Sequence, residues 1–317
     1  MTPDELDALL IGNSLPMRKL KALIPRVAAS TLPVLIEGET GTGKELVARA
    51  LHACSGRKGP LVTLNVCAVA DTMFEASMFG HTKGAFTGAL RDMPGYLTEA
   101  HGGTLFLDEI SGLSLANQVK LLRAIETKTF RPIGARVDHQ SDFRVVAASN
   151  ASMHHLIETG LFRRDLAQRL SGIQVRLAPL RERKEDLTAL IAHLARRARV
   201  ESDANRPIDT AALAVLQGYD WPGNVRELRH VVESALVLGS GSIVQDDVTD
   251  LLHPTSRMPG VHKGSAGRER ALLEHLEKYR WDVNAVAQAL GVHRATIYRQ
   301  MRKLGVDDIR DVISTRG

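Results

Sequence analysis

The stretch G-E-T-G-T-G-K-E, residues 38–45, constrains the fold of this chain more than any other part of its sequence. An apolar run, residues 33–36, comes directly before it, and a helical pattern, residues 45–52, follows it. Glycines between a strand and a helix let backbone N–H groups curl around an anion, and the lysine adds a positive charge. The pattern therefore predicts a phosphate-binding loop. The alternative, a glycine-rich turn with a chance lysine, is disfavoured by the strand–loop–helix context.

Strand and helix patterns alternate over the first half of the chain. The apolar runs that indicate central parallel strands are residues 33–36, 61–66, 104–107, 144–148 and 175–177. Helical patterns such as residues 115–126 separate them, which predicts an α/β fold with helices on both faces of a parallel sheet. From about residue 183 the strands stop. Residues 186–200, 209–217 and 225–238 then predict a helical subdomain.

Composition shifts divide the rest of the chain. The sequence G-S-G-S at 239–242 and the Pro-, Gly- and Ser-containing segment 253–267 indicate loose connections. We therefore predict an α/β core over 1–180, a helical lid over 181–252, a linker over 253–267 and a C-terminal all-α domain over 268–317.

The overall composition is that of a cytoplasmic protein without membrane insertion. No apolar run approaches the ~18 residues that span a bilayer, and the acidic N-terminus is unlike a signal peptide. Cys54 and Cys67 are the only cysteines among 317 residues, which fits a reducing compartment. The formal net charge of +5 is compatible with a nucleic-acid partner but is weak support for one.

A second motif, G-G-T-L-F-L-D-E-I at 102–110, ends an apolar strand with two adjacent carboxylates. Ligands of open α/β sheets bind at the carboxyl ends of the strands. Asp108 is expected to hold Mg²⁺ through its water shell, and Glu109 to orient or deprotonate the attacking water. Alone, such a pair could be a solvated strand end. Together with the phosphate loop it predicts a nucleoside triphosphatase.

Five motifs in order carry a family resemblance: G-E-T-G-T-G-K-E, then G-A-F-T-G-A at 84–89, the strand at 102–110, F-R-R-D-L-A-Q-R-L at 162–170 and W-P-G-N-V-R-E-L at 221–228. The chain resembles the sigma-54-dependent transcriptional activators, bacterial enhancer-binding proteins of the AAA+ superfamily of P-loop NTPases. The resemblance extends from about Ile11 to Leu304, and G-A-F-T-G-A is close to diagnostic. Glu45 departs from the common phosphate-loop pattern, which ends in Ser or Thr, but an acid is usual there in this family.

The resemblance implies roles for individual residues of an ATP site with Mg²⁺ at Asp108. The residues expected to bind ATP are Gly38, Glu39, Thr40, Gly41, Thr42, Gly43, Lys44, Glu45, Asn150 and Arg226. The residues expected to act in catalysis are Lys44, Asp108, Glu109, Asn65, Arg163 and Arg169. Asn65 would restrain Glu109, and Arg163 and Arg169 would reach the γ-phosphate of a neighbouring subunit. Surface or helix-capping roles are the alternative for these residues.

The same resemblance assigns the contact with sigma-54 to one loop. Its residues are Gly84, Ala85, Phe86, Thr87, Gly88 and Ala89, with Phe86 and Thr87 at the tip. An exposed phenylalanine between glycines is costly unless a partner buries it. The alternative is a tight turn that tucks Phe86 into the core.

Some positions depart from the family pattern without touching the phosphate or carboxylate residues. Before the loop, Ser77 and Met78 replace the usual Glu and Leu. After the loop, Asp92 stands where a basic residue is common, and Leu97 and Thr98 replace the usual Phe and Glu. At the end of a later strand, Ser149 replaces the usual Thr. These departures leave open how tightly the nucleotide is coupled to the loop.

The last block of sequence predicts a helix-turn-helix. Residues 285–290 and 294–303 form two helical patterns around a turn that contains Gly291. Ile297, Met301 and Leu304 share one face, which directs basic residues outward, as a helix in the DNA major groove requires. The block resembles a Fis-type domain. The residues expected to contact double-stranded DNA are His293, Arg294, Thr296, Arg299, Arg302 and Lys303. A solvated basic face is the alternative.

The combined interpretation is an ATP-hydrolysing transcription activator that binds upstream DNA, assembles into a homo-oligomer, a hexamer, and remodels sigma-54 RNA polymerase to open promoters. Only about ten residues precede the AAA+ pattern. We therefore expect either constitutive activity or restraint by a separate inhibitory protein, rather than by an N-terminal domain.

Two other functions stay open. One is a remodelling ATPase that acts on another protein. The other is a DNA-binding repressor whose nucleotide site only senses ATP. A P-loop kinase is disfavoured because the chain has two finger-like arginines and no recognisable lid for a substrate phosphate.

Overall fold

The structure is a computed structural model that describes residues 1–199, 209–238 and 245–252, and positions 275, 276, 278, 279, 283 and 286. The chain forms two compact units, Met1–Val248 and Thr249–Gly317. The predicted linker 253–267 and the six predicted DNA-contacting residues lie outside the described residues. In the part of the chain that is described, no helix combines the length and apolar character needed to cross a lipid bilayer.

A five-stranded parallel sheet forms the centre of the first unit. Its strands, in sheet order, are β2 (Leu61–Asn65), β5 (Thr104–Asp108), β8 (Arg144–Ser149), β1 (Val34–Glu37) and β9 (Ile173–Arg176). The phosphate loop follows the inner strand β1, and the two predicted carboxylates end the inner strand β5. The sheet confirms the predicted α/β fold.

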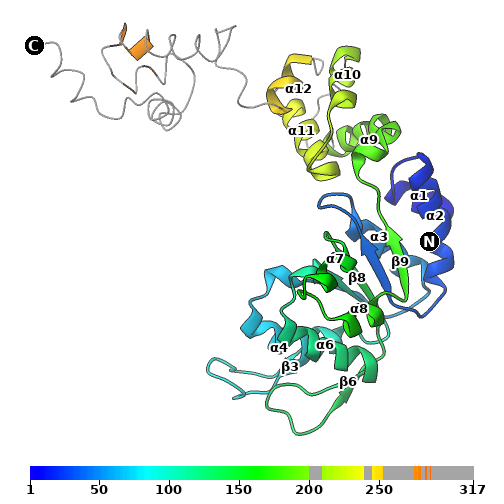
Figure 1. The fold of residues 1–317 in the computed structure, drawn as a ribbon, viewed down its shortest axis with the longest axis vertical. Coiled ribbons are helices and arrows are strands. Elements are labelled where there is room, and N and C mark those ends of the chain that lie inside the picture. Colours follow the sequence, from blue (N-terminus) through cyan, green and yellow to red (C-terminus); the bar gives the residue numbers. More distant parts are fainter. Residues whose placement is uncertain are drawn as a thin grey trace, which may run out of the picture. The chain divides into compact units, whose positions relative to one another are not determined.

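Both faces of the sheet are covered by helices, which explains the continuous apolar runs in the strands. Leu105 and Leu107 of β5 pack on one side, while Phe106 between them packs on the other. One side is covered by α1 (Pro3–Leu9), α2 (Leu15–Ala28) and α3 (Lys44–Cys54). The other side is covered by α4 (Asp71–Phe79), α6 (Leu115–Thr127), α7 (Met153–Glu158) and α8 (Arg164–Leu170). Figure 1 shows α1 and α2 on one side of the sheet and α4 and α6 on the other.

Two short hairpins extend from this core next to each other (Figure 1). The first pairs β3 (Gly80–His81) with β4 (Met93–Pro94) and carries the G-A-F-T-G-A loop. The second pairs β6 (Thr129–Phe130) with β7 (His139–Gln140). They are joined because the Thr82 N–H donates to the Ile133 carbonyl at 2.9 Å. The short helix α5 (Tyr96–Glu99) follows the first hairpin.

A helical lid follows the sheet, as the loss of strand patterns predicted. Its helices are α9 (Leu187–Arg199), α10 (Thr210–Gly218), α11 (Asn224–Leu238) and α12 (Gln245–Leu252). Trp221 in the turn before α11 is fully buried, and its indole N–H donates to the Leu216 carbonyl at 2.9 Å. The turn is therefore fixed against α10, and α11 begins at a defined place.

One charged side chain is buried at the start of a central strand. Arg144 is 3% exposed and donates to the carbonyls of Val27, Ala28 and Leu32, at 2.7, 2.9 and 3.2 Å. The last carbonyls of a helix lack partners within the helix. Arg144 supplies a partner for Ala28 and a further one for Val27, which also accepts from Ser30, and so ties α2 to the sheet. Burial lowers the pKa of Arg144, but arginine remains charged in proteins.

Replacement of Arg144 tests this anchoring. Arg144→Met keeps the length of the side chain but removes the guanidinium donors to the Ala28 and Leu32 carbonyls, so the free energy of unfolding should fall by about 2 kcal/mol or more. The matched control is Arg176→Met, because Arg176 is exposed on β9 of the same sheet and should change stability by less than about 0.5 kcal/mol. Urea unfolding measures both. Equal midpoints for the two variants would contradict the anchoring role.

Candidate active site

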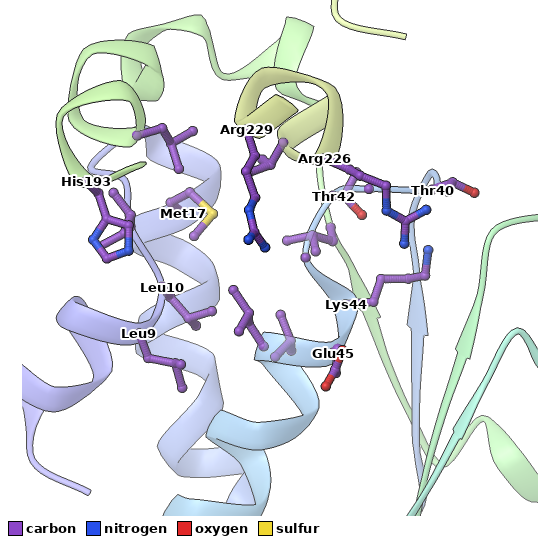
Figure 2. Close-up of a pocket in the computed structure, with 18 of the residues that line it drawn as sticks. Leu9, Leu10, Met17, Thr40, Thr42, Lys44, Glu45, His193, Arg226 and Arg229 are labelled. Atoms are coloured by element: carbon purple, nitrogen blue, oxygen red, sulfur yellow. The ribbon is translucent and has the colours of Figure 1, made fainter. Parts of the chain in front are cut away.

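A cavity of about 350 Å³ lies between the phosphate loop, the end of β5 and the lid. Apolar side chains line one part of it, and those from the N-terminal segment are Leu9, Leu10, Ile11 and Met17. The side chains of Lys44, Asp108, Glu109 and Arg226 line the other part. Figure 2 shows Leu9, Leu10 and Met17, with His193 beside them, on one side and Lys44 and Arg226 on the other. A cavity with an apolar surface and converging cations suits a ligand with a ring system and an anionic group.

The phosphate loop has the predicted left-handed turns. Gly41 and Gly43 have φ values of 81° and 105°, which other residues rarely adopt. Lys44 then opens α3, is 8% exposed, and donates from Nζ to the carbonyl oxygens of Gly38 and Glu39 at 2.7 and 3.1 Å. Burial lowers the pKa of Lys44, while Asp108 and Glu109 raise it.

The lid contributes a second cation to the same space. The backbone N–H groups of Val225 and Arg226 both donate to the Gly41 carbonyl, at 3.0 and 3.3 Å. These contacts place the first turn of α11 directly over the phosphate loop. Figure 2 shows the side chains of Arg226 and Lys44 directed toward the same part of the cavity. Two converging cations favour an anion between them.

Two residues assigned to ATP by resemblance have their side chains bound elsewhere. Glu39 accepts from both terminal nitrogens of Arg181, at 2.6 and 2.8 Å, and does not line the cavity. The bonds from Arg181 and Asn224 lower the pKa of Glu39 to about 2. Glu45 likewise pairs with Arg49 on the exposed side of α3, at 2.7 Å, although it borders the cavity.

The two predicted carboxylates meet Asn65 at the ends of neighbouring strands. The Asn65 amide donates to Glu109 Oε2 at 3.3 Å, and the Glu109 N–H donates to Asp108 Oδ1 at 3.0 Å. Glu109 has a φ of 55°, and such left-handed backbone at a non-glycine residue is concentrated at functional sites. Burial raises the pKa of Asp108, and the hydrogen bond from Glu109 opposes this shift.

The end of β8 is tied to both motifs. The Gly38 N–H donates to the Ser149 carbonyl at 3.1 Å. Ser149 itself is fully buried, with its hydroxyl bonded to Ala151. Asn150 accepts from the Ser111 hydroxyl at 3.1 Å and does not line the cavity. Asn150 is therefore next to the turn after Glu109 rather than over the phosphate loop.

The two predicted arginine fingers are away from this cavity. Arg163 pairs with Asp165 at 2.7 Å, and the side chains of Arg163 and Arg169 are exposed at opposite ends of α8. Neither lines the cavity of its own chain. A role in phosphate chemistry would therefore require the cavity of another subunit.

The G-A-F-T-G-A loop lies on the surface. The Gly84 N–H donates to the Ala89 carbonyl at 2.8 Å, and Gly84 and Gly88 have φ values of 80° and 99°. Phe86 is 37% exposed and its ring centre lies 4.9 Å from that of His81. The alternative that placed Phe86 in the hydrophobic core is thus wrong. Asp92 accepts from the Lys83 N–H at 2.7 Å and closes the base of the loop.

Four further basic residues line the cavity, and no motif in the sequence points to them. They are Arg183, His193, Arg197 and Arg229. Arg183 is 3% exposed and donates to the Thr42 carbonyl and to Met17 Sδ, both at 2.9 Å. In the sequence they appear only as basic residues within or just before helical patterns. Most basic residues in such positions are solvated, so the pattern does not distinguish cavity-lining residues from surface residues.

A phosphate loop on a parallel sheet, closed by a helical lid, defines a AAA+ P-loop NTPase domain. The chain matches the Sigma-54 interaction domain over residues 10–176, the AAA+ ATPase lid domain over 181–264 and the Fis family of bacterial regulatory proteins over 269–304. It belongs to the family of sigma-54-dependent transcription regulators, which confirms the predicted family.

Two curated relatives illustrate the similarity. The chain is 40% identical over 308 residues to the C4-dicarboxylate transport transcriptional regulatory protein DctD of Pseudomonas aeruginosa, covering 95% of this chain and 65% of DctD. It is 38% identical over 304 residues to the transcriptional regulatory protein ZraR of Salmonella typhimurium, covering 93% and 68%. The chain thus spans about two thirds of the length of these relatives.

Solved structures of NtrX from Brucella abortus share the fold. The ADP complex has a TM-score of 0.73 at 31% identity and covers 96% of this chain and 72% of NtrX. The ATP complex has a TM-score of 0.72 at 32% identity and covers 94% and 69%.

The ion pair of Glu39 predicts a pH dependence. Because the folded pKa of about 2 is below the ordinary value of 4.5, Glu39 contributes stability above pH 4.5 that is lost as the pH falls toward 2. Glu39→Gln should therefore lower the thermal midpoint at pH 7, and the difference from wild type should shrink below about pH 4.5. Melting curves between pH 7 and pH 3 measure it. A constant difference over this range would contradict the ion pair.

Proposed function

We propose that this protein hydrolyses ATP and uses the energy to remodel the closed complex of sigma-54 RNA polymerase, so that the promoter DNA opens. The observation that carries the proposal is the pairing of two features in one chain of the sigma-54 family. Lys44, Asp108 and Glu109 converge on a cavity, and a glycine-bounded surface loop presents Phe86. The proposed partners, chromosomal DNA and RNA polymerase, imply activity in the cytoplasm.

Lys44, Arg226, Glu109 and Asn65 have chemical roles in this proposal. Lys44 and Arg226 would bind the anionic oxygens of the phosphates, and the N–H groups of the loop would share that charge. Glu109 would orient the attacking water and accept its proton. Asn65 would hold the Glu109 carboxylate until ATP binding changes the site. The hydrogen bond from Asn65 to Glu109, at 3.3 Å, supports this last role.

The donor set of the cavity fits Mg²⁺. Asp108 offers the hard carboxylate oxygen that Mg²⁺ prefers, beside the phosphate loop. Among the described residues no group of three or more His, Cys, Asp or Glu could hold a metal ion, so phosphate oxygens and water would supply the other ligands. The bound ion would neutralise charge on the β- and γ-phosphates.

Subunits would complete one another's sites in a hexameric ring. Arg163 and Arg169 are exposed and remote from the cavity of their own chain, which supports a role at a neighbour's γ-phosphate. Arginine fingers of this kind are worth about 10³–10⁵ in rate. The ring would also place several Phe86 loops against one polymerase.

The C-terminal region would bring this ring to its promoter. The Fis-family match over 269–304 supports DNA binding. The residues proposed to contact DNA are His293, Arg294, Thr296, Arg299, Arg302 and Lys303. Because phosphate contacts dominate such binding, affinity should fall steeply with salt.

Promoter opening tests the whole proposal. Purified protein, sigma-54 RNA polymerase and a sigma-54 promoter are mixed with ATP, and melting is followed by permanganate footprinting. Phe86→Ala should abolish opening while ATP hydrolysis continues, because the loop is remote from the cavity. Leu15→Ala is the matched control, since Leu15 is an exposed apolar residue on α2. Hydrolysis by wild type without opening would favour remodelling of another protein.

A substitution at Glu109 separates catalysis from sensing. Glu109→Gln should lower the rate of ATP hydrolysis by about 10²–10⁴-fold, since the proton acceptor is lost, while the Kd for ATP stays within about threefold of wild type. Phosphate release and equilibrium binding measure the two quantities. If wild type shows no turnover above the Glu109→Gln background, the DNA-binding repressor that only senses ATP becomes the better account.

A further inference from the structure

The phosphate loop is held by the lid and the segment leading into it. Four consecutive loop residues are bound in this way: Glu39 by Arg181 and Asn224, the Thr40 carbonyl by Asn224, the Gly41 carbonyl by the N–H groups of Val225 and Arg226, and the Thr42 carbonyl by Arg183. Each of residues 39–42 is therefore bonded to the lid or to the segment before it.

These bonds determine which way the loop N–H groups face. The C=O and N–H of one planar trans peptide unit point in opposite directions. Because the Thr40 carbonyl accepts from Asn224 and the Thr42 carbonyl accepts from Arg183, the N–H groups of Gly41 and Gly43 point away from these two side chains. The contacts thus fix the direction of two loop N–H groups of the kind that bind phosphate.

Asn224 is the centre of this set of contacts. It is fully buried, and its amide donates to Glu39 Oε2 and to the Thr40 carbonyl, both at 3.1 Å. Its own oxygen accepts from the Leu180 N–H at 2.8 Å. Asn224 has a φ of 53°, a conformation in which asparagine is one of the few favoured residues. One side chain therefore joins the loop, the segment before the lid and α11.

Arg181 adds a charge that the loop needs. Glu39 places a negative carboxylate in a loop that must bind negative phosphates, and that carboxylate would repel them. The two bonds from Arg181 neutralise Glu39 and keep it out of the cavity. Without Arg181, the loop would keep the negative charge but lose its counter-ion.

We propose that Asn224 and Arg181 are positioning residues for the nucleotide: Asn224 holds the phosphate loop in its binding conformation, and Arg181 neutralises the Glu39 carboxylate and keeps it out of the cavity. This proposal rests on nucleotide binding as part of the proposed function, but not on hydrolysis or on sigma-54.

Asn224→Asp is the direct test, because it keeps the shape but puts a carboxylate against Glu39 and the Thr40 carbonyl. The Kd of the full chain for ATP should rise by about tenfold, as for loss of a charge-assisted hydrogen bond. Adding Glu39→Gln restores a donor opposite the new carboxylate and should recover most of the lost affinity. Isothermal titration with ATP and with ADP measures all variants.

Asn117→Asp is the matched control. Asn117 is also a buried asparagine, 4% exposed, whose amide donates to a carboxylate, Asp71 Oδ1 at 3.0 Å, but it lies on α6 and does not line the cavity. Its substitution should lower stability without changing the Kd for ATP. An equal loss of affinity in both variants would overturn the proposal, because general destabilisation would then explain the result.

Arg181→Ala provides a second test of the proposal if Asn224→Asp does not fold. The Arg181 side chain is 42% exposed, so its loss leaves no cavity in the core. The substitution should raise the Kd for ATP several-fold, and Glu39→Gln in the same chain should reverse the effect. Wild-type affinity in folded Arg181→Ala, or no rescue by Glu39→Gln, would overturn the proposal. Failure of wild type to hydrolyse ATP or open promoters would instead count against the proposed function.

Discussion

The first turn of α11 rests on the Gly41 carbonyl, and the rest of the site depends on this contact. Val225 and Arg226 donate their N–H groups to that oxygen, which brings the Arg226 side chain over the space that Lys44 enters from below (Figure 2). No larger residue could replace Gly41, because a Cβ atom there would lie 2.3 Å from the Gly223 carbonyl oxygen. Residues of both the α/β core and the lid line the cavity, so the cavity forms only when the two parts are together.

A short stretch of chain joins the surface loop to Asn65, which is hydrogen-bonded to Glu109. Glu109 bonds to Asn65 at the end of β2, and Asn65 caps the short helical turn Val66–Ala68. That turn leads into α4, whose last residue precedes β3 and the loop that carries Phe86. In the proposed function, a shift of Glu109 on hydrolysis would reach the loop through Asn65 and α4. At the base of that loop Asp92 accepts a hydrogen bond from the Lys83 N–H, and nearer its tip the His81 ring packs against the Phe86 ring.

Much of this fold could be predicted because the central strands are buried on both faces and read as continuous apolar runs. The sequence places the edge strand β9 at 175–177, whereas it spans Ile173–Arg176; the prediction misses its first two residues and runs one residue past its end, because exposed residues interrupt the apolar run. The motif residues of the site were found through spacing and family resemblance. The contacts of Glu39 with Arg181 and of Thr42 with Arg183 were not, because they join polar residues more than 140 positions apart and polar residues carry no periodic signal.

The proposed function requires that the state of the nucleotide sets how the Phe86 loop meets sigma-54. The affinity of the protein for labelled sigma-54 tests this requirement, followed by fluorescence anisotropy with no nucleotide, with ADP, and with ATP held unhydrolysed by Glu109→Gln. We expect a Kd at least about tenfold lower with ATP than with ADP or without nucleotide, within the usual range of allosteric coupling. The same Kd in all three states would contradict it.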